Sequence, residues 1–82
     1  MPMENRIAAI SIIVSEPDSV EQLNSLLHTY REYIIGRMGI PYRQRGLSII
    51  CLAVDAPSDV INGLTGKLGR LSGVTAKAAY SK

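Results

Sequence analysis

Two runs of this chain, Ile7–Val14 and Leu47–Val54, are apolar at nearly every position. Both are rich in Ile, Val and Leu and are followed by turn-forming residues, a pattern typical of β-strands. Because successive side chains of a strand point to opposite faces, both faces of these two strands are mostly apolar. Such strands belong in the centre of a sheet with apolar cover on each side, which strongly limits the folds open to a chain of 82 residues.

Four strands and two helices account for most of the sequence. The strands are expected at residues 6–14, 33–40, 47–54 and 74–80, and a first helix at about 19–30. A second helix should begin with Pro57 in its first turn and stop at Gly73. The short connection 41–46 predicts an antiparallel hairpin between the second and third strands.

Local signals refine the two helices. Asp18 with Glu21, or Ser19 with Gln22, has the spacing of a capping box at the start of the first helix. The second helix carries Gly63, Gly66 and Gly69 in its interior, and each costs about 1 kcal/mol of helix propensity relative to alanine. These glycines suggest that a strand of the sheet, another subunit or, third in rank, a ligand lies close to that helix.

The order strand–helix–strand–strand–helix–strand predicts an α+β fold, a ferredoxin-like βαββαβ sandwich in one domain, residues 1–82. Right-handed crossovers put both helices on one face of an antiparallel sheet of strand order 4-1-3-2. The other face should be apolar in its centre and more polar at its edges, where Thr75, Lys77 and Arg37 are expected.

An apolar patch of this kind on a small protein usually marks an interface. We therefore expect a homo-oligomer, a dimer or tetramer, in which a second subunit covers this face. The predicted interface residues are Ile7, Ala9, Ile13, Leu47, Ile49 and Cys51.

Composition excludes several other classes. Cys51 is the only cysteine, so there is no disulfide framework, and a reducing, cytoplasmic location fits. No apolar run approaches the roughly 20 residues of a membrane span, and the polar start of the chain does not resemble a signal peptide. The net charge is only +2, and Lys67, Arg70, Lys77 and Lys82 form no dense basic run, so neither membrane nor direct nucleic-acid binding is expected.

Three segments resemble a known family of small stand-alone proteins, the iron-only hydrogenase system regulators. They are Leu26-Leu27-His28, Arg37–Arg43 (RMGIPYR) and, most specifically, Leu64–Val74 (LTGKLGRLSGV). The resemblance implies an ACT-like fold similar to the C-terminal domain of nickel-responsive repressors. It also implies a regulatory role, in transcription among other possibilities, as an oligomeric module that senses a small ligand.

Two groups of residues are candidates for ligand binding. In ACT-like dimers an amino acid commonly lies near the first strand–helix loop, and the matching positions here are Ser15, Glu16, Asp18 and Ser19. This loop lacks the glycine often found in amino-acid-binding ACT domains, and a plain capped turn is the alternative. The second group is Tyr42, Arg43 and Arg45 in the predicted hairpin, where arginines could bind carboxylate or phosphate and the ring could stack.

Catalytic and metal-binding patterns are weak. No Ser/His/Asp set, no Cys–His motif and no paired carboxylates in an apolar setting are evident, so we expect no enzyme and no cofactor. One histidine, His28, and one cysteine, Cys51, fall in different elements, whereas transition-metal sites need about four ligands, so no metal site is predicted. The alternatives that remain open are a protein–protein interaction module without a ligand and a metal-responsive sensor.

Overall fold

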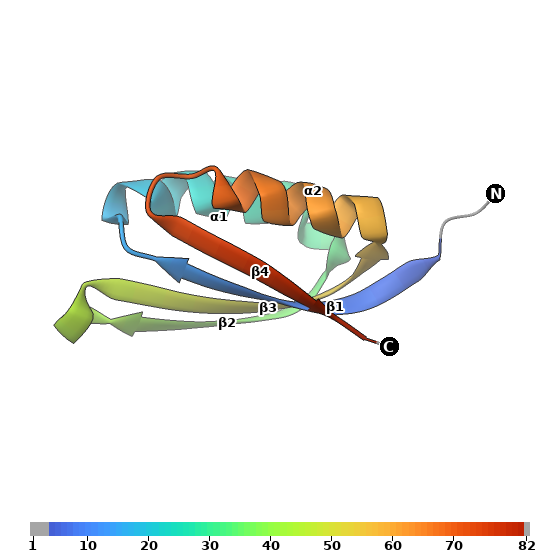
Figure 1. Ribbon diagram of the computed structural model, residues 1–82, viewed down its shortest axis with the longest axis horizontal. Coiled ribbons are helices and arrows are strands. Elements are labelled where there is room, and N and C mark those ends of the chain that lie inside the picture. Colours follow the sequence, from blue (N-terminus) through green and yellow to red (C-terminus); the bar gives the residue numbers. More distant parts are fainter. Residues whose placement is uncertain (1–3, 82) are drawn as a thin grey trace.

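The computed structural model describes residues 4–81, which form a four-stranded sheet with two helices on one face (Figure 1). The strands are β1 (Asn5–Val14), β2 (Ile34–Tyr42), β3 (Leu47–Pro57) and β4 (Val74–Tyr80), and the helices are α1 (Val20–Thr29) and α2 (Ser58–Gly69). Three short 3₁₀ turns, Pro17–Ser19, Arg31–Tyr33 and Arg43–Arg45, connect them. Residues 1–3 and Lys82, which belong to the predicted domain 1–82, lie outside the described residues.

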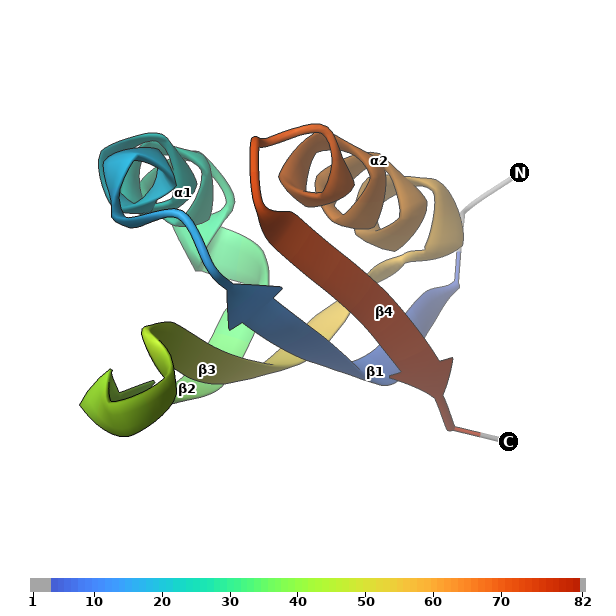
Figure 2. The same ribbon diagram turned by 60° about the vertical axis from the view of Figure 1, so that its left-hand side comes forward.

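The sheet is antiparallel throughout, with the strand order β2-β3-β1-β4. Read from the β4 edge, this order is 4-1-3-2, so the two doubly apolar runs form the central strands, as predicted. The crossovers β1-α1-β2 and β3-α2-β4 place both helices on the same side of the sheet (Figure 2). The fold is therefore α+β with one helical layer on one sheet.

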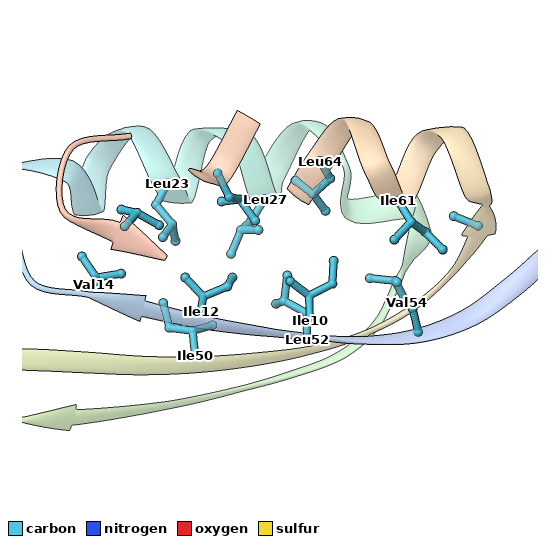
Figure 3. Close-up of a cluster of buried hydrophobic side chains, with 14 residues drawn as sticks. Ile10, Ile12, Val14, Leu23, Leu27, Ile50, Leu52, Val54, Ile61 and Leu64 are labelled. Carbon is cyan, nitrogen blue, oxygen red and sulfur yellow. The ribbon is translucent and has the colours of Figure 1, made fainter. Parts of the chain in front are cut away.

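The hydrophobic core fills the space between this sheet and its helices (Figure 3). Alternate residues of the central strands point into it, and residues at helical spacing on α1 and α2 meet them. The principal members are Ala8, Ile10, Ile12, Val14, Ile50, Leu52, Val54 and Ala56 from the strands, and Leu23, Leu27, Ile61, Leu64 and Leu68 from the helices. None of these side chains is more than 8% exposed.

Several predicted boundaries were too short. β2 includes Pro41 and Tyr42, so the hairpin turn is only Arg43–Gly46, and Gly46 ends it with φ +65°. β3 continues to Pro57 because Asn5–Ile7 of β1 extend the ladder opposite residues 55–57. The prediction that Pro57 lies in the first turn of α2 is therefore wrong, because Pro57 ends β3 and precedes the helix.

The glycines of α2 have no close neighbour within the described chain. A Cβ at Gly66 or Gly69 would meet no atom within 4 Å, and one at Gly63 would meet only the Tyr30 Oη, at 3.8 Å. The prediction that a strand of the same sheet lies against this face is therefore wrong. Contact with another subunit or a ligand at these glycines stays a prediction.

Within residues 4–81, neither α1 nor α2 is long and apolar enough to cross a membrane.

Candidate functional site

The sheet face away from the helices is apolar and uncovered in the single chain. The registers of the strands place its residues in rows that run across the sheet. One row is Ile40, Ile49, Ile13 and Thr75; the next is Met38, Cys51, Ser11 and Lys77; a third is Gly36, Ala53, Ala9 and Ala79. We call this surface the open face.

All six predicted interface residues lie on the open face, because they alternate along β1 and β3 with the buried core residues. Ile7 and Ile13 are 47% and 44% exposed, and Ala9 is also exposed. Leu47, Ile49 and Cys51 are half-buried by their neighbours on the sheet. Their position is thus established, and their coverage by a second subunit stays a prediction.

The β2 edge of the open face is apolar, contrary to expectation. Met38, Ile40 and Tyr42 pair with Cys51, Ile49 and Leu47 and point outward on the open face, each at least 44% exposed. Arg37 pairs with a core residue, Leu52, and lies on the helix side.

The cause of this error is an irregularity between Ile34 and Gly36, which shifts the register of β2 by one residue. The shift places Ile34 against the core and Met38 on the open face, although their spacing predicts a common face. At the opposite edge, Thr75 and Lys77 of β4 are exposed beside Ile13 and Ser11, as expected.

The first candidate ligand group is a tight junction between two loops. Ser19 Oγ donates to the Ser72 carbonyl at 2.6 Å, and Ser15 donates to the Gly73 carbonyl through its amide at 2.8 Å and its Oγ at 3.1 Å. Gly73 has φ +70°, and a Cβ there would lie 2.3 Å from Cγ of Glu16. The predicted capping-box bonds are absent from this part of the described chain, because the Ser19 hydroxyl, only 3% exposed, is used between the loops.

The carboxylates of this group face outward. Glu16 and Asp18 are exposed and line a shallow, acidic hollow with Glu21, Gln22, Ser25, Ser19 and Ser72. The structure thus brings Ser15, Glu16, Asp18 and Ser19 together, but the two serine hydroxyls hold loops together. Only Glu16 and Asp18 present free polar oxygens to a ligand, and these favour a cation over an anion.

The second candidate group is split by the hairpin. Arg43 borders a mainly apolar hollow formed by Val14, Pro17 and Val20 on one side and by Pro41, Gly46, Leu47 and Ser48 on the other. Tyr42 lies on the open face opposite Leu47, and Arg45 is exposed in the turn. The hollow shares no lining residue with the acidic one, although Pro17 stands between Glu16 and Asp18 in the chain. We call it the Arg43 hollow.

The potential metal ligands lie apart. His28 is exposed in the last turn of α1, where Arg31 Nη1 is 3.2 Å from its Nε2, whereas Cys51 is on the open face of β3. Within residues 4–81, His, Cys, Asp and Glu side chains form no group of three that could hold a metal ion.

Sequence reasoning missed the polar contacts beside α1. Arg37 Nη2 donates to Asn24 Oδ1 at 3.1 Å, and Lys67 Nζ donates to Tyr30 Oη at 3.1 Å while lying 5.4 Å from the centre of that ring. The first contact had a partial signal, because Asn24, His28 and Arg31 recur at spacings of four and three residues on one side of the helix. Arg37 reaches Asn24 because the register of β2 places Arg37 on the helix side of the sheet.

Two solved structures are similar to this chain. One is the uncharacterized protein TM1266 from Thermotoga maritima, with 38% sequence identity, a TM-score of 0.93, and coverage of 96% of this chain and 100% of that one. The other is a formyltetrahydrofolate deformylase from Pseudomonas putida KT2440, with 15% identity, a TM-score of 0.64, and coverage of 89% of this chain but 28% of that one. The second likeness shows the fold alone. A comparison with curated proteins gives no match.

One family model matches residues 6–78, nearly the whole chain, and its description is "Iron-only hydrogenase system regulator, putative". The match includes both helices, β2 and β3 in full and most of β1 and β4, and it contains the three segments on which the sequence resemblance rests. The chain therefore belongs to the TM1266-like family of iron-only hydrogenase system regulators.

Proposed function

We propose that this protein is a non-enzymatic regulatory module of an iron-only hydrogenase system that assembles as a homo-oligomer and senses a small ligand. The family supplies the system and the regulatory role. The open face supports assembly, and the Arg43 hollow supports sensing.

The open face is the observation that carries the proposal. Among the described residues, seven large hydrophobic side chains are exposed, and five of them, Ile7, Ile13, Met38, Ile40 and Tyr42, lie on this one face. The other face of the same sheet is already buried by α1 and α2. Exposed apolar residues gathered in this way are typical of an interface, whereas scattered ones are not.

A second copy of the chain is the occupant that fits this face best. In a two-fold dimer the same patch meets itself, so the apolar rows of β2, β3 and β1 would cover one another. The polar residues Thr75, Lys77 and Asp55 lie toward the β4 edge and one end, where an interface has its hydrated rim. A domain of 82 residues with one core layer also gains stability by burying a second apolar surface.

The Arg43 hollow is our candidate for the sensing site. A carboxylate could pair with the Arg43 guanidinium while an apolar group lies against Val14, Pro17 and Val20. Glu16 and Asp18, on either side of Pro17, would favour a ligand that also carries an amino group. This combination supports a small amino-acid-like molecule, whereas the other two candidate residues of the hairpin, Tyr42 and Arg45, do not line the hollow.

We further infer an ACT-like domain of the ferredoxin-like class, supported by the element order, the sheet order and the shared side of the two helices. A cytoplasmic location is supported by the free, half-buried Cys51. A net charge of only +2 argues against direct contact with nucleic acid or membrane. Control of transcription would therefore act through a DNA-binding partner.

Native mass spectrometry of protein purified without air and without chelator tests the proposal. An even oligomer that retains a stoichiometric organic mass supports the sensor, and the mass identifies the ligand. A bare even oligomer would favour an interaction module without a ligand, and a retained metal ion would favour a metal-responsive sensor. A monomer at micromolar concentration would overturn the argument from the open face.

A further inference from the structure

The groove between α1 and the start of β2 gathers positive charge. Its floor is apolar, and its walls carry polar or charged side chains from three separate elements. The floor is formed by Leu27 and Ile34, and the walls by Asn24, His28, Arg31 and Arg37. Two guanidinium groups thus border one concave surface, at the opposite end of α1 from the Arg43 hollow.

Neither arginine has a carboxylate among its hydrogen-bond partners. Arg37 Nη2 donates to the amide oxygen of Asn24 at 3.1 Å. Arg31 Nη1 donates to the His28 carbonyl at 3.0 Å and lies 3.2 Å from His28 Nε2. The two guanidinium groups therefore keep most of their donors, and no negative charge compensates them in these bonds.

Acidic side chains lie beyond the groove. Glu21 is one turn before Asn24 and lines a neighbouring hollow with Ser25, His28 and Thr29. Glu32 follows Arg31 but is exposed and does not line the groove. No carboxylate therefore stands among the residues that line the groove.

The neutral side chain of Asn24 leaves the charge of Arg37 uncompensated. An aspartate at this position would have the same shape and would neutralise Arg37 through an ion pair. The amide instead fixes the orientation of the guanidinium through one hydrogen bond and leaves its charge available. A planar, oriented fork of N–H donors is the arrangement that binds a carboxylate or phosphate through paired bonds.

We propose that the groove between α1 and β2 binds a small organic oxyanion whose phosphate or carboxylate group lies between Arg31 and Arg37. The apolar floor would contact the carbon part of the ligand. This site is separate from the Arg43 hollow and does not depend on the oligomeric state, so it can stand even where the proposed function fails.

The test is an anion titration of the wild-type protein and three variants, followed by ¹H–¹⁵N correlation spectra. Inorganic phosphate and succinate are the two probes, with chloride replaced to hold the ionic strength constant. Arg37→Gln removes one guanidinium. Asn24→Asp keeps the shape but supplies an internal carboxylate, and its unchanged or raised melting temperature shows that the fold is intact. Arg70→Gln removes the same charge from the exposed end of α2 and is the matched control.

For the wild-type protein we expect saturable shifts at the Asn24 side-chain amide and at residues 31 and 37. Arg37→Gln and Asn24→Asp should weaken binding at least about tenfold, since the first removes a guanidinium and the second engages it in an internal ion pair, and Arg70→Gln should bind as the wild type does. Saturation by phosphate alone identifies a phosphorylated ligand, and saturation by succinate alone a carboxylate. Shifts that never saturate with either probe, or equal affinities in all four proteins, would overturn the proposal.

Discussion

Replacing Ile13 with lysine is expected to abolish self-association and leave the fold intact. Ile13 is 44% exposed on the open face of a central strand, between Ile49 on β3 and Thr75 on β4. Its neighbour Ile49 is more buried, so a lysine there would risk unfolding the subunit as well. At Ile13 the aliphatic part of a lysine can follow the sheet and place its ammonium in water when the chain is alone.

The size of the effect follows from the exposure. Burying a whole isoleucine side chain contributes about 1.5–3 kcal/mol, so covering the exposed part of Ile13 contributes about 1 kcal/mol per subunit. A two-fold dimer contains the residue twice, and the variant would also bury two ammonium groups, each at a cost of several kcal/mol. A loss of roughly 4 kcal/mol or more raises the dissociation constant by about a thousandfold.

Sedimentation velocity over a range of concentrations measures the assembly, and far-ultraviolet circular dichroism measures the fold. The control is Thr29→Lys, which adds the same charge at an exposed side chain of α1, away from the open face and from both proposed ligand sites. We expect a folded monomer for Ile13→Lys and the wild-type oligomer for Thr29→Lys. Equal oligomers in the two variants would show that subunits do not meet through the open face.

Three further predictions concern the scaffold and are checked by thermal unfolding. Gly73→Ala should lower the free energy of unfolding by about 2 kcal/mol or more, because of φ +70° and the contact with Glu16; an unchanged melting temperature would contradict this geometry. Gly66→Ala should raise the free energy of unfolding by up to about 1 kcal/mol, since nothing lies within 4 Å of where the new Cβ would be. A weaker oligomer would instead reveal a subunit packed on α2. Ser19→Ala should lower the free energy of unfolding by about 1 kcal/mol, because the hydrogen bond to the Ser72 carbonyl is lost. A gain in stability would refute a stabilising role for this bond.

The central strands could be predicted because their signal is local. Along β1, Ile10 and Ile12 are buried while Ile7 and Ile13 are exposed, and this alternation follows directly from the period of a strand. The β2 edge could not be predicted in the same way. Its irregularity after Ile34 changes which residues share a face, and no feature of the segment Ile34–Tyr42 alone marks the position of that shift.

In the candidate site, too, the local pattern could be predicted and the contacts between distant segments could not. Residue type and position placed Ser15 and Ser19 in the polar segment after β1, where the structure also has them. Their function in the fold was not visible, because their hydroxyls donate to carbonyls 58 and 53 residues away along the chain. A serine before a helix predicts a local cap, but a partner from another loop can take its hydrogen bond, and only the folded chain decides between them.

The positions of the two candidate sites suggest how sensing and assembly could be coupled. The Arg43 hollow borders one end of β2, at Pro41, and the Arg31–Arg37 groove borders the other. β2 is also the edge strand that contributes Met38, Ile40 and Tyr42 to the open face. A ligand at either end can shift the assembly equilibrium only by as much as its affinity differs between free and assembled subunits. The coupling is reciprocal, so a ligand that strengthens the oligomer must bind the Ile13→Lys monomer more weakly by the same factor per subunit. Equal affinities for the monomeric variant and the oligomer would mean that binding and assembly are independent in this fold.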